Sequence, residues 1–569
     1  MSEQTIPTVA ISERILDLLQ AEGIETLWGI PDPGVQTLFH AANRRGMKVV
    51  SGHHEAAQAF MADAEARMTG RPTIVSGNQG PGVANLLPAA VSASKEKVPV
   101  IFLAEQRSRF LDKQVRRAKF QYTDQPRFFE PAMKYVGIIE HAEQTEDILR
   151  EAFRQAMTGT PGPVYVEYPQ DHVNAQIEDK PVLAPEAYRV VSQKAEPSAI
   201  EAAVELLVGA QFPIILAGTG IHMARGHEEF QQLAEALQCP VVPSWGGRGV
   251  LSDTHNQVMP WGTEISDEAI KAADVVLAIG TGIGEPLKFG RGAIWEQGDA
   301  DRKWIYIEKD VLNIGVNRHI DVPLVGNLKD ICPQLTTALA PRKTFERPQL
   351  LSDLIDLMVA FRQGIIDEAP DTYPVHPGRM IVEATRESPD DLIMVRDGGC
   401  TCLWEGMYHI FDGRDYLANS NFGHLGVGLP YAIGAAVATK GKRPVLLITG
   451  DSAFGFHTSE LETAVRLGLP IVCVVNSDSA WGMEHIGFRV QFGEGNDVGV
   501  KWGNVRYDKV AEGFGAHGEY CERTEEIAPA MARAWAAGKP AVVHVAVDAK
   551  ANAEPPYWEQ FAGAYNNYY

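Results

Sequence analysis

The chain has 569 residues, of which 45% are hydrophobic and 22% charged, a composition typical of a folded protein with several domains. Its 51 Lys and Arg residues stand against 73 Asp and Glu residues, which gives a formal net charge of −22. Such a surface repels nucleic acid and anionic membranes, so we expect neither as a partner. An anionic ligand would need a metal ion or a few placed basic residues.

The cysteines and the N-terminal residues indicate a reducing compartment. Six cysteines in a chain of this length do not form a disulfide framework, and the close pair Cys400 and Cys402 lacks the further ligands of a zinc site. The chain begins Met-Ser-Glu-Gln-Thr, without the basic and apolar regions of a signal peptide, and no apolar stretch of about 20 residues follows. The sequence predicts a cytoplasmic protein.

The first part of the chain alternates helical patterns with short apolar runs. Ser12 can cap a first helix, which Gly23 can end. Strands are expected at Thr26–Ile30, Thr73–Ser76, Val98–Ala104 and Val164–Tyr168. Strands separated by helices predict a parallel sheet with both faces covered. The polar, proline-containing residues 177–197 are expected to form a linker.

The same alternation recurs twice more. Further strands are expected at Pro213–Ala217, Asp274–Ile279, Lys303–Ile307, Leu392–Arg396, Val445–Thr449, Ile471–Asn476 and Ala541–Val547. Residues 339–372 are expected to be a second linker. Glycine turns at 218–220 and 280–284 lack the full spacing of a dinucleotide fingerprint, which favours tight turns over NAD binding. The sequence thus predicts an α/β protein with three doubly wound parallel-sheet domains.

The last residues differ from the rest in being rich in aromatic side chains. Beyond Pro555-Pro556 the chain carries Tyr557, Trp558, Phe561, Tyr565, Tyr568 and Tyr569. An exposed segment of this kind would promote aggregation, so we expect it to pack on something. Two alternatives stay open: packing on its own domain, and closing over an active site as a lid.

The turn after the expected strand at 445–449 can hold an anion and a metal ion. Gly450-Asp451-Ser452-Ala453 combines small residues, whose N–H groups can approach phosphate oxygens, with an acid that can bind a divalent cation. A helix then returns to a second strand, which ends at Asn476-Ser477-Asp478. Positions 451 and 478 are 27 residues apart (478 − 451), the length that brings two neighbouring strand ends together.

These segments resemble the metal–diphosphate motif of thiamine diphosphate enzymes. Three further segments resemble pieces of that family in the order it requires: 51–57 (Ser-Gly-His-His-Glu-Ala-Ala), 78–82 (Asn-Gln-Gly-Pro-Gly) and 423–430 (Gly-His-Leu-Gly-Val-Gly-Leu-Pro). The resemblance covers nearly the whole chain. It implies a pyrimidine-binding domain at 1–180, a middle domain at 195–340, a diphosphate-binding domain at 370–550 and a C-terminal tail at 551–569.

The resemblance implies the cofactor thiamine diphosphate, held through Mg²⁺. The metal ligands would be Asp451, Asp478 and the carbonyl of Ala480. Most members of the family carry an amide where this chain has Asp478, and aligning one step off would make Asn476 the ligand instead. The other expected cofactor-binding residues are Glu55, Gly399, Cys400, Thr401, His424, Leu425, Gly450, Ser452, Ala453 and Trp481.

Two of these residues have expected roles in activating the cofactor. Glu55 would hydrogen-bond the pyrimidine ring, and the Ala-rich stretch after it suits the apolar setting that this role needs. Leu425 would press the cofactor into a bent form. By resemblance, Glu55 of one subunit would serve the cofactor held by Asp451 of another, which implies a homodimer or homotetramer.

Three comparisons bear on the substrate. Gly29-Ile30-Pro31 resembles oxalyl-CoA decarboxylases and 2-hydroxyacyl-CoA lyases, whereas Phe120-Gln121 resembles benzaldehyde lyase and acetolactate synthase. The segments 287–290 and 303–308 resemble the CoA enzymes. The mixture favours a carbon–carbon lyase that cleaves a 2-hydroxyacyl-CoA into formyl-CoA and an aldehyde or ketone. The alternative is an acetolactate synthase-like or benzaldehyde lyase-like carboligase or decarboxylase acting on free 2-oxo acids or hydroxyketones.

Five residues are expected to act on such a substrate or on a nucleotide. Gln121 would hold the thioester or hydroxyl oxygen, and Glu494 would take the 2-hydroxyl proton. Glu308 would contact a bound ADP, and Lys288 and Arg291 could meet the phosphates of CoA.

Overall fold

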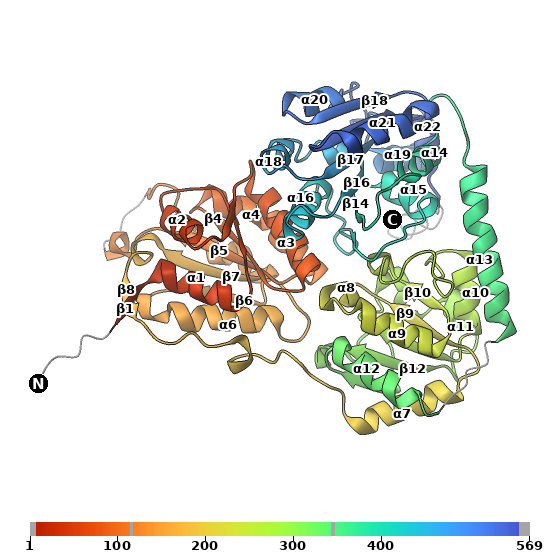
Figure 1. Cartoon of the computed structure of the whole chain (residues 1–569), viewed down its shortest axis with the longest axis horizontal. Helices are drawn as coiled ribbons and strands as arrows, with labels where there is room; N and C mark the ends of the chain where they lie inside the picture. Colours follow the sequence, from red (N-terminus) through yellow and green to blue (C-terminus); the bar gives the residue numbers. More distant parts are fainter. Residues whose placement is uncertain (1–6, 114–117, 343–347, 557–569) are drawn as a thin grey trace, which may run out of the picture. The chain divides into compact units, whose positions relative to one another are not determined.

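The computed structural model describes residues 7–113, 118–342 and 348–556, and Figure 1 traces the chain. The chain divides into two compact units, Met1–Val191 and Ser192–Tyr569. The aromatic tail, which is expected to pack on its own domain or to form a lid, lies outside the described residues. Its aromatic residues are Tyr557, Trp558, Phe561, Tyr565, Tyr568 and Tyr569. Within the described ranges, no helix has the length and the apolar character that crossing a membrane requires.

The first unit is built on a six-stranded parallel sheet with the order β3-β2-β4-β5-β7-β6. Its strands are β2 (Thr26–Gly29), β3 (Lys48–Val50), β4 (Thr73–Gly77), β5 (Val100–Gln106), β6 (Tyr135–Ile138) and β7 (Val164–Pro169). Its helices are α1 (Ile11–Ala21), α2 (Gln36–Arg44), α3 (Glu55–Thr69), α4 (Pro81–Glu96), α5 (Gln125–Phe129) and α6 (Thr145–Met157). The unit also has an antiparallel pair formed by β1 (Thr8–Ala10) and β8 (Gln176–Glu178).

Two details at the ends of this unit correct the sequence predictions. Ser12 does not cap α1: it lies inside the helix with its side chain buried, and its N–H donates to the Val173 carbonyl at 3.1 Å. The first N–H groups of α1 therefore find backbone acceptors in place of a capping side chain. Gly23 follows the helix with a φ of 76°, as a helix-ending glycine does. The predicted linker starts late, because Ile177 belongs to β8.

The second unit contains two sheets, the first of which has five parallel strands in the order β10-β9-β11-β12-β13. The strands are β9 (Pro213–Ala217), β10 (Val241–Pro243), β11 (Val275–Ile279), β12 (Lys303–Glu308) and β13 (Val322–Val325). The helices around it are α7 (Pro197–Gly209), α8 (Gly220–Ala224), α9 (His227–Leu237), α10 (Glu264–Ala272), α11 (Ala293–Glu296) and α12 (Leu328–Leu339). Separate apolar clusters cover its two faces.

The other sheet of the second unit has six parallel strands in the order β15-β14-β16-β17-β19-β18. They are β14 (Ile393–Arg396), β15 (Tyr416–Leu417), β16 (Val445–Gly450), β17 (Ile471–Ser477), β18 (His517–Cys521) and β19 (Ala541–Ala546). The helices are α14 (Pro377–Thr385), α15 (Cys400–Tyr408), α16 (Gly428–Ala438), α17 (Asp451–Phe454), α18 (Glu460–Arg466), α19 (Gly482–Phe492), α20 (Tyr507–Gly513), α21 (Thr524–Ala536) and α22 (Ala549–Asn552). The predicted α/β fold with three parallel sheets is confirmed.

The segment between these two sheets is a helix, α13 (Gln349–Glu368), where the sequence analysis expected a linker at 339–372. Its buried residues Leu351, Leu354, Ile355 and Met358 join an apolar cluster on one face of the five-stranded sheet. Their spacing is that of one helix face, and burial of this face stabilises a segment that would otherwise be a flexible connection.

Candidate cofactor site and the adjoining cavity

The neighbouring strands β16 and β17 end side by side, with Gly450 paired to Asn476. Asp451 is the first residue of α17, directly after β16, and Asp478 follows β17. Since both strands run in the same direction, their carboxyl ends place the two acids at one edge of the sheet. The structure therefore brings together the two residues that the sequence analysis selected as metal ligands.

Asp451 is held by hydrogen bonds from its own turn and from the end of β17. One carboxylate oxygen accepts from the Ser452 N–H at 2.7 Å, and the other accepts from the Ser479 N–H at 2.8 Å and the Ser477 hydroxyl at 3.0 Å. Burial, together with the nearby Asp478 carboxylate, raises the pKa of Asp451 to about 7. A divalent cation between the two acids would offset both effects.

Asp478 and Asn476 are both used by neighbouring groups. The Asp478 carboxylate accepts from the Ala480 N–H at 3.1 Å and from the Asn552 amide at 2.6 Å, and burial raises its pKa. The amide N–H₂ of Asn476 donates to Thr401 and to Asn552, each at 3.1 Å, while its buried carbonyl oxygen has no hydrogen-bond partner among the described residues.

A pocket of about 190 Å³ lies at these strand ends. The expected cofactor residues that line it are Gly399, Cys400, Thr401, Leu425, Gly450, Asp451, Ser452, Asp478, Ala480 and Trp481. Ala453 is buried inside α17 and His424 lies in the adjoining cavity. The sequence analysis did not select Gly423, Gly482, Met483, Glu484 and Asn552, which also line the pocket. Within the described ranges, no group of three or more His, Cys, Asp or Glu side chains is arranged to hold a metal ion, so a metal ion here would depend on carbonyl and ligand oxygens as well.

The turn that carries Leu425 is fixed from both sides by buried polar groups. The Asp397 carboxylate, at the end of β14, accepts from the N–H groups of Gly398 at 2.6 Å and Gly428 at 2.8 Å. The His457 ring bonds the Gly426 carbonyl at 2.7 Å. Burial raises the pKa of Asp397 to about 7, since the site is fully enclosed. The position of Leu425 at the pocket thus depends on contacts made by residues distant in sequence.

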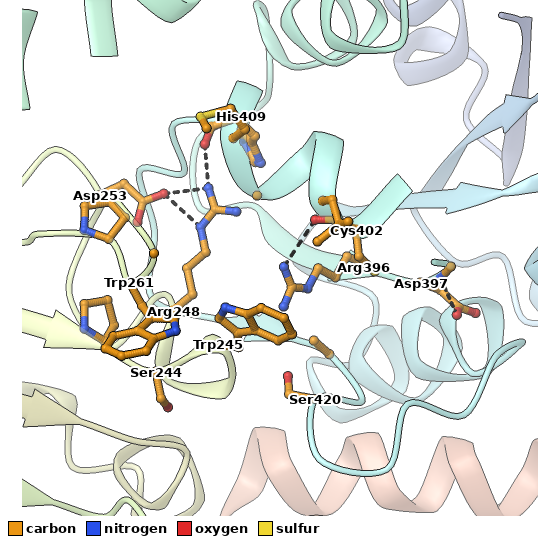
Figure 2. A pocket seen from close by; sticks show the side chains of 18 of the residues that line it. Ser244, Trp245, Arg248, Asp253, Trp261, Arg396, Asp397, Cys402, His409 and Ser420 are labelled. Carbon is orange, nitrogen blue, oxygen red and sulfur yellow. Dashed lines mark hydrogen bonds and ion pairs between the residues drawn. The ribbon is translucent and has the colours of Figure 1, made fainter. Parts of the chain in front are cut away.

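A larger cavity of about 420 Å³ adjoins the pocket and shares four of its lining residues, Gly399, Gly423, Leu425 and Met483. Figure 2 shows part of its wall. Much of the lining is apolar and includes Trp245, Trp261, Met358, Phe361, Leu403, Met407 and Ile410. Three arginines also line it: Arg248, Arg362 and Arg396.

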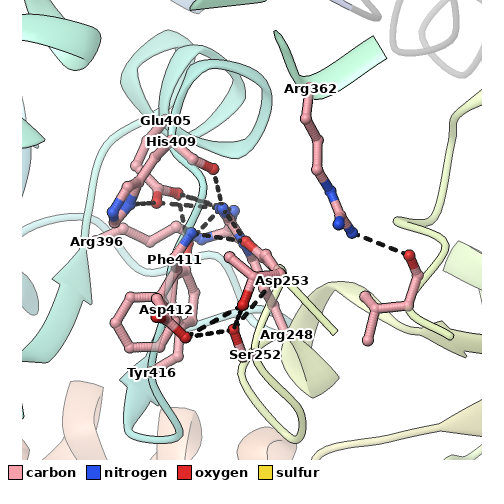
Figure 3. Close-up of polar contacts among 12 residues, drawn as sticks. Arg248, Ser252, Asp253, Arg362, Arg396, Glu405, His409, Phe411, Asp412 and Tyr416 are labelled. Carbon is pink, nitrogen blue, oxygen red and sulfur yellow. Dashed lines mark hydrogen bonds and ion pairs between the residues drawn. The ribbon is translucent and has the colours of Figure 1, made fainter. Parts of the chain in front are cut away.

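A buried charge network forms one side of this cavity (Figure 3). The Arg248 guanidinium donates to Asp253 at 2.7 and 3.0 Å and to both oxygens of Glu405 at 3.0 Å. Glu405 also accepts from Tyr416 and bonds the His409 ring at 2.8 Å. Burial alone would raise the pKa of Glu405, but Arg248, with His409 and Arg396, lowers it to about 2. The network connects the segment after β10 to α15.

The expected residues of the first unit meet at the turn Gly80-Pro81-Gly82. Glu55 begins α3, where it is half-buried and accepts a hydrogen bond from the Asn85 amide at 3.0 Å. A side chain on Gly82 would collide with the Asn78 side chain and lie close to the Glu55 carboxylate, and one on Gly80, which has a φ of 74°, would collide with the Gln121 carbonyl. The Gln121 backbone beside Gly80 and the side chains beside Gly82 explain the two glycines.

The remaining expected residues line neither of the two cavities. Glu494 is exposed in the loop after α19. Lys288 and Arg291 are exposed near the end of β11, and Arg291 donates to the Asn317 carbonyl at 3.2 Å. The Glu308 carboxylate, at the end of β12, accepts from Tyr306 at 2.9 Å and from the N–H groups of the two residues that follow it. The roles expected for these four residues stay predictions.

Comparison with protein families identifies the class of protein that this fold and pocket define. Three family models of thiamine pyrophosphate enzymes match the chain: the N-terminal TPP binding domain at residues 9–128, the central domain at 200–335 and the C-terminal TPP binding domain at 397–545. The chain belongs to the thiamine pyrophosphate (thiamine diphosphate) enzyme family.

Individual relatives carry several different activities in their names. Acetolactate synthase of Bacillus subtilis (strain 168) is 29% identical, over 94% of this chain and 93% of its own length. The 2-hydroxyacyl-CoA lyase of Arabidopsis thaliana is 28% identical, over 97% and 98%. Oxalyl-CoA decarboxylase of Escherichia coli (strain K12) is 26% identical, over 95% of each. The protein is thus a thiamine diphosphate-dependent enzyme with relatives acting on both CoA thioesters and other substrates, as their names indicate.

Proposed function

We propose that this enzyme is a 2-hydroxyacyl-CoA lyase, which cleaves a 2-hydroxyacyl-CoA into formyl-CoA and an aldehyde or ketone, and can run the reverse condensation. The observation that carries the proposal is the cavity of about 420 Å³ that adjoins the cofactor pocket through Gly399, Gly423, Leu425 and Met483. Its aromatic and aliphatic lining suits the acyl chain and the arm of a thioester, and its arginines suit an anionic substrate.

The residues of the pocket fit thiamine diphosphate bound through Mg²⁺. Asp451, Asp478 and the Ala480 carbonyl would ligate the metal ion, and the two buried carboxylates would lose their mutual repulsion when it binds. The N–H groups of the turn at 450–452 would bond the diphosphate oxygens. When bound, the cofactor supplies a carbon that can stabilise the negative charge left by breaking a carbon–carbon bond.

The protein side chains would position the reacting groups and move protons. Glu55 would hold a proton at the pyrimidine ring, and Leu425 would keep the cofactor bent. Gln121 would bond the thioester or hydroxyl oxygen, and Glu494 would accept the 2-hydroxyl proton as the bond between C1 and C2 breaks. The products would be an aldehyde or ketone and, once the C1 carbon has gained a proton, formyl-CoA. We propose a homodimer or homotetramer, with active sites between subunits.

A second candidate function follows from the relative named acetolactate synthase and from Phe120-Gln121, which resembles that group. In that case the enzyme would act on free 2-oxo acids or hydroxyketones. Purified protein with thiamine diphosphate and Mg²⁺ separates the two. Formyl-CoA released from a 2-hydroxyacyl-CoA supports the lyase. Acetolactate formed from pyruvate, without formyl-CoA, supports the alternative.

ADP as a bound effector at Glu308 is a further part of the proposal. Calorimetric titration of the protein with ADP, in the wild type and in Glu308→Gln, tests it. A Kd that the substitution raises supports the site, and the absence of binding removes ADP from the account.

A further inference from the structure

Helix α13 contributes one wall of the large cavity. Met358, Phe361, Arg362 and Ile365 line the cavity and lie on one face of the helix, at the spacing i, i+3, i+4 and i+7. Three of these side chains are apolar and the fourth is a guanidinium. Figure 3 shows Arg362 with a dashed line to a carbonyl oxygen, which is that of Val258. α13 gives the cofactor pocket no lining residue.

Arg362 has few partners for its five N–H donors. One of its terminal nitrogens donates to the Val258 carbonyl at 3.1 Å. Within the ranges that the structure describes, it forms no ion pair with a carboxylate. Burial lowers the pKa of Arg362, and the nearby charge of Asp253 acts in the opposite direction. A half-buried cation in this state has lost part of its hydration without gaining a counter-ion.

The other two arginines of the cavity are already neutralised by acids. Arg248 is paired with Asp253 and with Glu405. Arg396 has a terminal nitrogen 3.8 Å from Glu405, and its guanidinium carbon lies 5.4 Å from the centre of the Tyr416 ring. These two acids are therefore shared between Arg248 and Arg396, and neither pairs with Arg362.

The other acid that lines the cavity, Asp397, is also hydrogen-bonded elsewhere. Its carboxylate accepts from the N–H groups of Gly398 and Gly428. The lining thus has three guanidinium groups, and the acids that pair with Arg248 and Arg396 are Asp253, which lines the cavity, and Glu405, which does not. Within the described ranges, Arg362 is paired with neither. In a chain of net charge −22, this uncompensated positive charge marks a place for an anionic group of a ligand.

We propose that Arg362 is a specificity-determining residue that binds a phosphate group of the CoA moiety in this cavity. The proposal rests on the proposed function, since it names the part of a CoA thioester that Arg362 recognises. A guanidinium matches the oxygens of a phosphate with two parallel hydrogen bonds. Because α13 does not line the cofactor pocket, the group bound by Arg362 belongs to the part of the substrate that does not react.

A residue that binds a phosphate group of CoA raises the affinity of the enzyme for the substrate and leaves the rate of the chemical step unchanged. Arg362→Gln is expected to raise the KM for a 2-hydroxyacyl-CoA by roughly 10- to 100-fold at unchanged kcat. The corresponding pantetheine thioester, which has no phosphate, should be turned over equally by the two proteins. Arg362→Lys keeps the charge but loses the paired hydrogen bonds, so an intermediate KM is expected.

Equilibrium binding to the holoenzyme separates this proposal from the proposed function. CoA and pantetheine are titrated into wild type, Arg362→Gln, Arg362→Lys and Lys271→Gln. The last is the control, because Lys271 is a partly exposed charge of α10 that pairs with Glu268 and does not line the cavity. We expect CoA to bind wild type and Lys271→Gln within about twofold of each other, and Arg362→Gln roughly 10- to 100-fold more weakly. Pantetheine should bind all four proteins alike, which also shows that the variants are folded.

Two results would overturn the role of Arg362 and leave the lyase intact: equal CoA affinity in wild type and Arg362→Gln, or an equal loss of pantetheine and CoA affinity in Arg362→Gln. Wild type that binds no CoA and releases no formyl-CoA would contradict the proposed function, and with it this inference.

Discussion

The candidate cofactor pocket and the large cavity beside it are built in different ways. The pocket is formed mainly by short turns at the ends of two adjacent strands, where Asp451 and Asp478 meet and small residues leave the backbone accessible. The cavity is lined by segments from both sheets of the second unit and from α13, and its polar wall depends on charge pairs such as Arg248 with Glu405. A pocket of the first kind is encoded locally, and one of the second kind depends on the tertiary fold.

The largest expected effect is a loss of turnover when Glu55, which is proposed to contact the cofactor, is replaced. Glu55→Gln should lower turnover by roughly 10²- to 10⁴-fold, because the amide cannot share a proton with the pyrimidine ring. Steady-state kinetics measures the loss, and titration with thiamine diphosphate should show cofactor binding retained. Glu186→Gln, an exposed site in the same unit, is the matched control. Full turnover in Glu55→Gln would contradict the proposed mechanism.

Asp451→Ala should weaken the binding of thiamine diphosphate in the presence of Mg²⁺ by at least roughly 100-fold, since the metal loses an oxygen ligand. Calorimetry on the metal-free protein, with and without added Mg²⁺, measures this. The exposed Asp371→Asn serves as control. If Mg²⁺ strengthened cofactor binding equally in wild type and Asp451→Ala, the metal site would have to lie elsewhere.

That the residues of the pocket lie together could be predicted from the sequence, because they are close together in the chain. Gly450-Asp451-Ser452 and Asp478 follow two strands separated by one helix, so their proximity follows from βαβ geometry. Short strands such as β10 and β15 were missed, since so few residues carry no clear period.

The cavity could not be predicted in the same way. Arg248, Arg362 and Arg396 are isolated arginines far apart in sequence, and only tertiary packing brings them to one wall. Lys288 and Arg291, expected at the CoA phosphates, both lie outside this cavity. Nothing in the sequence singles out Arg362, since it lies in the segment expected to be a linker, although the apolar residues of α13 have helical spacing.

The contribution of the buried charge network beside the cavity to protein stability can be tested by substitution. Glu405→Gln should lower the free energy of unfolding by about 2 kcal/mol, because Arg248 would lose its charged partner in a buried site. Denaturant unfolding measures this, with Glu201→Gln as the control, since its pair with Arg342 is exposed and worth less than about 1 kcal/mol. Equal effects of the two substitutions would show that the network does not stabilise the cavity.

The smallest expected effect is a pH dependence that arises from Asp397. Burial raises its pKa to about 7 from an ordinary value of 3.8, so the folded protein holds a proton that the unfolded chain releases. This contribution to stability is fully present below pH 3.8, declines as the pH rises toward 7 and is absent above it. The stability of wild type relative to Asp397→Asn should therefore fall by at least about 1 kcal/mol between pH 4.5 and 7.5. A constant difference across this range would contradict the assigned shift.

The central claim is that the cofactor pocket and the cavity together serve the cleavage of a 2-hydroxyacyl-CoA. The most direct measurement is product analysis after the purified protein, thiamine diphosphate and Mg²⁺ are mixed with such a thioester. The account predicts formyl-CoA and an aldehyde or ketone in equal amounts. Acetolactate from pyruvate, with no formyl-CoA from any 2-hydroxyacyl-CoA offered, would contradict it.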